Sequence, residues 1–314
     1  MLPVFLDIDP RNNHVSRIAV NELKQAWVVH GGEIANPNIP SRIERLLLRK
    51  SSKIEDSSEN FFVPLMSPHI TNYPRKFLKQ KKTIYLFCWD VFPSNRNEWL
   101  DVFKRLNPKV IFLTSSDSIA LFSDFKDYKF ELIPEAITVE NFIGTKLLKE
   151  RQIDILEFGR RWNKLHEALR DIAMKLSLLH IYPKENELLF KSTEDFVDGL
   201  RNSKVIVCTP GSWSHPSSLD RYNGVELLTR RYLEAMAAGA ILVGHCPRDL
   251  EKIMNINPVI EISDPEAQVE VIEDLFSNLE FLQEKVDANL EWTRINGDWA
   301  LRVKTLEEII MKNT

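Results

Sequence analysis

The chain has 314 residues, 44% of them hydrophobic, and a formal net charge of −4. This length supports two domains of ordinary size, each with its own apolar core. The acidic balance and the lack of a recognised nucleic-acid-binding module argue against nucleic acid as a partner. No apolar run approaches the roughly 18 residues that span a bilayer, and Asp7 interrupts the apolar start of the chain, so we expect a cytoplasmic protein.

Short apolar runs alternate with helical patterns through the first half of the chain. A strand is predicted at 3–7 and a helix at about 14–29, where Val20, Leu23 and Trp27 share one face. The polar and Ser-rich stretch 50–60 predicts a surface loop. Further strand-length runs, bounded by polar turns, lie at 61–65, 83–87, 110–113 and 130–133. This alternation predicts a parallel sheet with helices on both faces.

The second half shows the same alternation more clearly. A strand at 154–158 leads through Gly159 and Arg160 into a helix over 163–179. Strands are then predicted at 188–190, 205–208, 240–245 and 259–262, and helices at 265–278, 279–291 and 298–312. We therefore expect an α/β protein with two Rossmann-like domains, 1–150 and 151–314, that join near 143–152.

Glu226 and Glu234 stand eight positions apart, directly before the apolar strand 240–245. Thr229 suits a helix N-cap, and Gly239 suits the left-handed turn that ends a helix. The helix would therefore begin near Arg230, with Glu226 in the loop above its N-terminus and Glu234 about one turn inside. Two such carboxylates can accept hydrogen bonds from a ribose and a sugar while the helix N-terminus faces phosphate. On spacing alone, an ordinary amphipathic helix with solvated charges explains the same residues.

The stretch from Gly224 to Gly239 resembles the E-x7-E element of group-1 glycosyltransferases with the GT-B fold. The wider segment 215–245 is similar to the bacterial polysaccharide-type members, and 155–160 matches their strand–Gly–Arg turn. The similarity covers the second half of the chain. It departs from the family at Leu227 and Leu228, where Gly and Phe often follow the first Glu.

The resemblance implies that Glu234 holds the nucleotide ribose, Glu226 contacts the donor sugar, and Gly159 with Arg160 lies at the diphosphate. It implies two Rossmann-like domains with a cleft between them, and a terminal segment, Trp292 to Thr314, that packs back on the first domain. The expected donor is a nucleoside diphosphate sugar, and the expected acceptor is a glycan or lipid-linked molecule in surface polysaccharide or glycoconjugate assembly. Retention of anomeric configuration is expected, with no cofactor.

Other polar residues near these motifs are candidates for donor binding. Arg161 and Lys164 can help Arg160 to neutralise the leaving diphosphate without a metal, although charges at a helix start are commonly solvated. Arg231, three positions before Glu234, shares its helix face. His215 lies in the turn-rich loop 209–218 and can contact the donor or simply cap a turn.

Activation of the acceptor hydroxyl is expected from the first domain. Asp7, Asp9 and His14 lie between the first strand and the first helix, where a doubly wound sheet opens towards its ligand. Asp7 and Asp9 also form a D-x-D sequence, but we expect no metal there. Trp89 and Asp90 are a second candidate pair for lining the acceptor site, and a tryptophan packed in the core is the simpler interpretation.

Ten Lys and Arg stand against four Asp and Glu between Arg42 and Lys82. This segment would suit an anionic membrane surface, which would place the protein peripherally at the inner face of the membrane, or an acceptor diphosphate. It also suits an ordinary solvated face. The three cysteines Cys88, Cys208 and Cys246 are far apart in apolar surroundings, so they predict core residues rather than a disulfide or zinc site.

Three other classes of protein share some of these features. A nicotinamide-dependent dehydrogenase needs a G-x-G-x-x-G turn, which this chain with its ten glycines lacks. A two-lobed sugar-binding protein has similar length and layering but requires an export signal. A nucleotide-sugar epimerase on the same fold stays open, because release of free nucleotide on transfer to an acceptor is what would distinguish a transferase.

Overall fold

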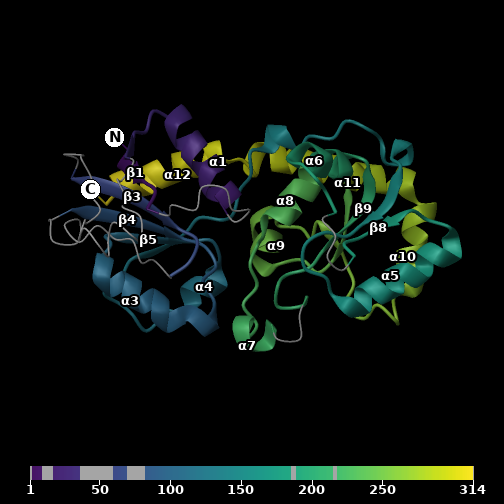
Figure 1. Ribbon diagram of the computed structural model, residues 1–314, viewed down its shortest axis with the longest axis horizontal. Coiled ribbons are helices and arrows are strands. Elements are labelled where there is room, and N and C mark those ends of the chain that lie inside the picture. Colours follow the sequence, from purple (N-terminus) through teal and green to yellow (C-terminus); the bar gives the residue numbers. More distant parts are fainter. Residues whose placement is uncertain are drawn as a thin grey trace, which may run out of the picture. The chain divides into compact units, whose positions relative to one another are not determined.

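A computed structural model describes residues 2–8, 17–35, 59–68, 82–184, 189–214 and 218–313. The chain divides into two compact units, one formed by Met1–Pro134 with Trp299–Thr314 and the other by Glu135–Asp298 (Figure 1). The division falls before the boundary expected near 143–152. The reason is that Ile137, Val139 and Phe142 pack into the apolar core of the second unit.

In its described residues, the first unit contains one parallel sheet of six strands in the order β2-β1-β3-β4-β5-β6. Its strands are β1 (Val4–Leu6), β2 (Ile34–Ala35), β3 (Asn60–Leu65), β4 (Thr83–Cys88), β5 (Val110–Leu113) and β6 (Phe130–Leu132). Its helices are α1 (Ile18–Val29), α3 (Arg96–Leu106), α4 (Ser116–Ala120) and α12 (Trp299–Met311). The predicted strands are confirmed, whereas β2, α3 and α4 were not predicted. The loop predicted at 50–60 lies almost wholly outside the described residues.

Aromatic side chains fill the core of the first unit. Trp27 of α1 is fully buried and stacks on Phe62 of β3 with ring centroids 4.4 Å apart, so the predicted apolar face of α1 is confirmed. Helix α12 packs beside α1, and its buried Trp299 lies 6.3 Å from the ring of Phe87 in β4. The last helix of the chain therefore belongs to the first unit.

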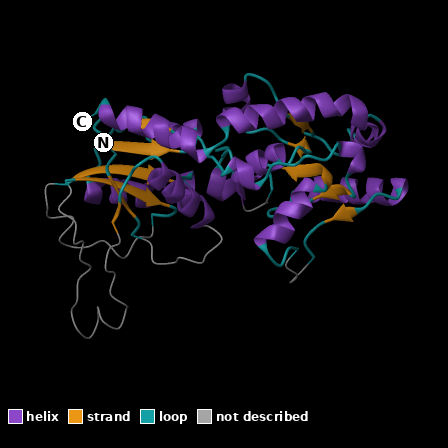
Figure 2. Cartoon of the chain, turned by 90° about the horizontal axis from the view of Figure 1, so that it is seen from above, coloured by secondary structure: helices purple, strands orange, loops and turns teal. Residues whose placement is uncertain are grey.

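The described part of the second unit contains one parallel sheet of five strands in the order β11-β10-β9-β7-β8. The strands are β7 (Ile153–Leu156), β8 (His180–Ile181), β9 (Ser203–Cys208), β10 (Ile241–Gly244) and β11 (Val259–Glu261). The helices are α5 (Asn163–Leu176), α6 (Thr193–Arg201), α7 (Ser218–Tyr222), α8 (Arg230–Ala237), α9 (Arg248–Met254), α10 (Val269–Ser277) and α11 (Leu279–Asn296). In each unit, helices cover both faces of the sheet (Figure 2).

The expected strand at 188–190 is not formed, since Leu189 and Phe190 are not in a strand and 188 lies outside the described residues. Phe190 instead packs on Phe196 of α6, with ring centroids 5.4 Å apart. The apolar run therefore covers a helix that the sequence did not predict.

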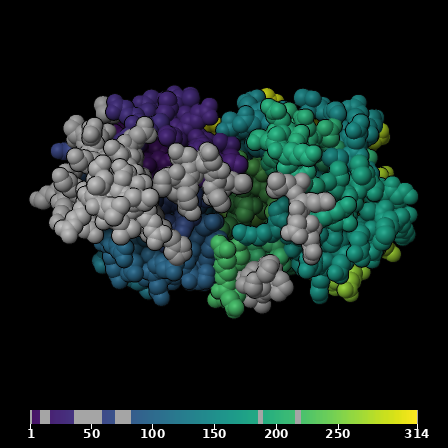
Figure 3. All heavy atoms as spheres, viewed as in Figure 1, coloured from purple at the N-terminus to yellow at the C-terminus, as the bar shows by residue number. Residues whose placement is uncertain are grey.

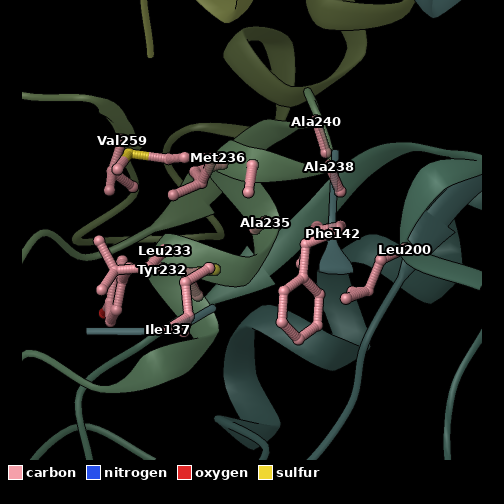
Figure 4. Close-up of a cluster of buried hydrophobic side chains, with 14 of the residues drawn as sticks. Ile137, Phe142, Leu200, Tyr232, Leu233, Ala235, Met236, Ala238, Ala240 and Val259 are labelled. Atoms are coloured by element: carbon pink, nitrogen blue, oxygen red, sulfur yellow. The ribbon is translucent and has the colours of Figure 1, made fainter. Parts of the chain in front are cut away.

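Helix α8 is buried along most of its length (Figure 4). Tyr232, Leu233 and Met236 belong to the core of the second unit, together with Ile137 and Phe142. Gly239 has φ +68°, which confirms the predicted end of the helix. Because Glu234 is only 7% exposed, the charges of this helix are not all solvated, and an ordinary surface helix is excluded.

All three cysteines are buried, as predicted for core residues, and their thiols are free. Among the described residues, none of the helices combines the length and apolar composition needed to cross a membrane.

Candidate functional site

The direction of strand connection reverses between β7 and β9 in the second unit. β8 follows β7 in sequence but lies on its outer side, whereas β9 pairs with the opposite side of β7. In open parallel sheets, ligands bind beyond the carboxyl ends of the strands at such a switch point. The loops after Leu156 of β7 and Cys208 of β9 therefore mark the candidate site.

The turn after β7 is shaped by Gly159 and held by Arg231. Gly159 has φ +71°, which disfavours other residues, and a Cβ there would collide with the guanidinium of Arg231. Arg231 of α8 donates a hydrogen bond to the carbonyl oxygen of Arg160 (3.2 Å) and lies 5.0 Å from the ring centre of Phe158. Arg231 thus binds the turn to the start of α8.

Arg160 extends towards the loop after β9. It donates a hydrogen bond to the hydroxyl of Tyr222, and its guanidinium lies 5.6 Å from the centre of that ring. Gly211 leaves room for this pair, because a Cβ there would collide with both side chains. Tyr222 is the last residue of α7, a helix that lies at the surface (Figure 3). The side chain of Tyr222 is buried, whereas that of its neighbour Arg221 is exposed. Arg160 is therefore held across the switch point.

Glu234 lies near the end of β9. Burial raises the pKa of the Cys208 thiol to about 12, and the charges of Arg231 and Glu234 act on it in opposite directions. Arg230 forms an ion pair with Glu234 (Nε to Oε1, 3.1 Å) one turn earlier in the helix. The sequence predicted Arg231 as the neighbour of Glu234 and did not assign Arg230 to the site.

Glu226 is fixed by a histidine beyond the end of β10. His245 Nε2 lies 3.1 Å from Glu226 Oε1, and His245 Nδ1 is bonded to Glu261 of β11. Because a neutral imidazole carries only one N–H, the two carboxylates together favour the protonated ring. Burial alone would lower the pKa of His245, but the hydrogen bonds and charges of Glu226 and Glu261 raise it above its ordinary value.

The same contacts act on Glu226. Burial alone would raise its pKa, but the hydrogen bond and charge of His245 and the backbone N–H of Arg248, 3.3 Å from Oε2, lower it. Trp213, in the loop after β9, stacks on the imidazole of His245 with centroids 4.2 Å apart. Sequence reasoning missed His245, although a histidine at the carboxyl end of a buried strand was a visible signal.

Two further residues, Lys164 and His215, are predicted to bind the donor. Lys164 is exposed in the first turn of α5, and His215 lies outside the described residues. Of the predicted donor-binding residues, the structure brings Gly159, Arg160 and Arg231 into one contact group.

The predicted acceptor residues belong to the first unit. Asp7 follows β1, at the switch point between β1 and β3, and is bonded to the buried Arg17 at the start of α1. Asp9 and His14 lie outside the described residues. Trp89 is 3% exposed and packs on Phe87 with ring centroids 4.3 Å apart, so Trp89 is a packed core residue.

No protein-family model matches the chain, and no curated protein matches it by sequence. Solved structures do match. HepE from Anabaena in complex with UDP and glucose has a TM-score of 0.60 at 11% identity, covering 99% of this chain and 100% of that chain. A sucrose-phosphate synthase from Thermosynechococcus elongatus has a TM-score of 0.63 at 11% identity, covering 99% of each chain. A glycosyltransferase from Rickettsia africae has a TM-score of 0.61 at 12% identity, covering 99% and 98%.

The two parallel sheets and these neighbours define the fold class. The chain is an α/β protein with two Rossmann-like units, consistent with the GT-B glycosyltransferase fold.

Proposed function

We propose that this chain is a glycosyltransferase that moves a sugar from a nucleoside diphosphate sugar to an acceptor hydroxyl. The observation that carries the proposal is the arrangement at the β7–β9 switch point, where the Gly159–Arg160 turn contacts α8 near Glu234. The fold adds support, because HepE from Anabaena has been solved in complex with UDP-glucose.

Each residue has a role that its chemistry suits. Glu234 accepts hydrogen bonds from the ribose hydroxyls, and Glu226 accepts them from the donor sugar. Arg160, with Arg231, Lys164 and His215, stabilises the diphosphate as the bond from the anomeric carbon to its oxygen breaks. The acceptor oxygen forms the new glycosidic bond, and its proton passes to a base, for which Asp7, Asp9 and His14 are the candidates.

The proposed reaction proceeds with retention of anomeric configuration, and the proposed acceptor is a glycan or a lipid-linked molecule. A panel of nucleotide sugars scored by thermal shift would identify the donor. Incubation with candidate acceptors should then release free nucleoside diphosphate. An isomerised donor would indicate an epimerase instead, and tight binding without turnover would indicate a non-catalytic sugar-binding protein.

Turnover is expected to persist in excess chelator, since arginines and not a metal are assigned to the diphosphate. The measurement compares initial rates with EDTA, without it, and after addition of Mn²⁺ or Mg²⁺. Loss of activity in EDTA that either metal restores would point back to Asp7 and Asp9 as a metal site.

Peripheral contact with an anionic membrane is proposed for the basic segment 42–82, of which the structure describes only 59–68 and Lys82. Each cation near such a surface contributes about 1 kcal/mol at most, so binding should be weak and sensitive to salt. Charge reversal at Arg75, Lys76, Lys79 and Lys82 should lower cosedimentation with anionic vesicles and leave nucleotide binding intact. Reversal of the exposed Lys104 and Arg105 on α3 is the control. If the parent protein binds no vesicles at low salt, the segment is a solvated face.

A further inference from the structure

A buried polar cluster lies beside the proposed donor site, at the β8 side of β7. Glu157 follows β7, His166 is in the first turns of α5, and His180 begins β8. Glu157 Oε1 lies 2.7 Å from His166 Nδ1 and 2.7 Å from His180 Nε2. One ligand atom from each residue lies within 4.8 Å of the others, and two histidines with a glutamate are a common set of zinc ligands.

The hydrogen-bond directions in this cluster argue against a metal. Arg161 Nη1 lies 3.3 Å from His166 Nε2, and a guanidinium can only donate. His166 Nε2 must therefore accept, so that Nδ1 carries the proton given to Glu157. A metal on Nδ1 would require a proton on Nε2, directed at the Arg161 donor. Histidines that bind metals normally donate their other N–H to an acceptor.

Charge leads to the same conclusion. His166, whose Nε2 accepts from Arg161, is neutral and links the negative Glu157 to the positive Arg161, so these three side chains carry no net charge. A divalent cation would add two uncompensated positive charges to side chains that are nearly buried, with Glu157 at 3% and His166 at 9% exposure. Burial of unpaired charge is costly.

Arg161 has a second contact on the same side. Its guanidinium lies 6.0 Å from the ring centre of Tyr182, and that ring packs on His166 and His180 at 4.7 and 4.8 Å. Arg160 contacts Tyr222 and faces the loop after β9 instead. Two consecutive arginines thus extend to opposite sides of β7.

We propose that His166, oriented by Glu157 and His180, anchors Arg161 and thereby positions Arg160 for the donor diphosphate. This inference rests on the proposed function. His166 and Arg161 are positioning residues, because they act on the ligand through the Gly159–Arg160 turn. Glu157 supplies the acceptor that selects the required tautomer of His166.

A matched pair of substitutions at His166 tests the proposal. The amide of Gln can occupy the place of Nε2 and accept from Arg161, whereas the amide of Asn can only take the place of Nδ1 beside Glu157. Calorimetry with UDP and with uridine separates the diphosphate contact from the nucleoside. His166→Asn should weaken UDP binding about tenfold and leave uridine binding unchanged, while His166→Gln stays within about threefold of the parent.

Arg161→Ala provides a second measurement if either His166 variant is unstable. It should weaken UDP binding, and the double variant with Arg160→Ala should bind no more weakly than Arg160→Ala alone, because both act through one contact. Arg170→Ala, an exposed arginine of α5, is the control.

Three results would overturn the inference. They are equal effects of Asn and Gln at His166, additive effects of the two arginine variants, and stoichiometric bound zinc whose removal unfolds the protein. If the parent protein binds no nucleoside diphosphate, including UDP, GDP and ADP, the proposed function itself is wrong.

Discussion

Replacing Glu234 with alanine is expected to weaken binding of the preferred nucleoside diphosphate by about 1–3 kcal/mol, the scale of a lost charged acceptor to buried hydroxyls. Glu234 is 7% exposed, lies near the end of β9, and is paired with Arg230. In the proposed complex, the ribose then loses its acceptor, and Arg230 remains beside it as a cation without this carboxylate. Isothermal titration calorimetry measures the difference.

Two further variants separate these effects. Glu234→Gln keeps the size of the side chain and one acceptor oxygen, so its loss of affinity should be smaller than that of the alanine variant. Glu167→Ala, an exposed glutamate of α5, should bind nucleotide like the parent. Unchanged affinity in folded Glu234→Ala protein would show that the ribose assignment is wrong.

Replacing His245 with glutamine is expected to lower the free energy of unfolding by about 2 kcal/mol near pH 6. This value lies within the range for the loss of a hydrogen bond between charged partners. It is below the upper end of that range because the groups are partly exposed to solvent. The side chains of His245 and Glu226 are 20% and 11% exposed, so solvent screens them only in part. Glutamine can donate to one of the two carboxylates but carries no charge. Chemical denaturation across a pH series measures the loss.

The effect should depend on pH in a defined direction. The folded-state pKa of His245 lies above its ordinary 6.5, so its stabilisation is fully present below that value and is lost as the pH rises through the folded pKa. The folded-state pKa of Glu226 lies below its ordinary 4.5, so its contribution is lost as the pH falls through that lower value. The difference between parent and variant should therefore be largest between the two ordinary values.

His30→Gln is the matched control, since His30 faces one carboxylate, Glu307, and is 35% exposed. It should change stability by only a few tenths of a kcal/mol, as expected of a surface pair. A difference for His245→Gln that does not shrink at alkaline pH would contradict the protonated bridge between Glu226 and Glu261.

Several elements were predictable because local sequence patterns report burial. The apolar face of α1 and the long strands β3 and β4 follow from periodicity and apolar runs. The end of α8 follows from Gly239, whose left-handed conformation few other residues adopt. The two-residue strands β2 and β8 were missed, because two residues are too short to show a period and pair only through their neighbours. The apolar run 188–190 was misassigned, because burial against a helix resembles burial in a sheet.

The sequence by itself determined the alternating α/β class, the apolar strands and the candidate residues Glu226, Glu234, Gly159 and Arg160. Only the tertiary structure decided which side chains meet. Tyr222 reaches Arg160 and His245 reaches Glu226 because the strand order β10-β9-β7 brings their loops to one edge of the sheet. Strand order depends on contacts between segments far apart in the chain, and no local pattern of residues encodes those contacts.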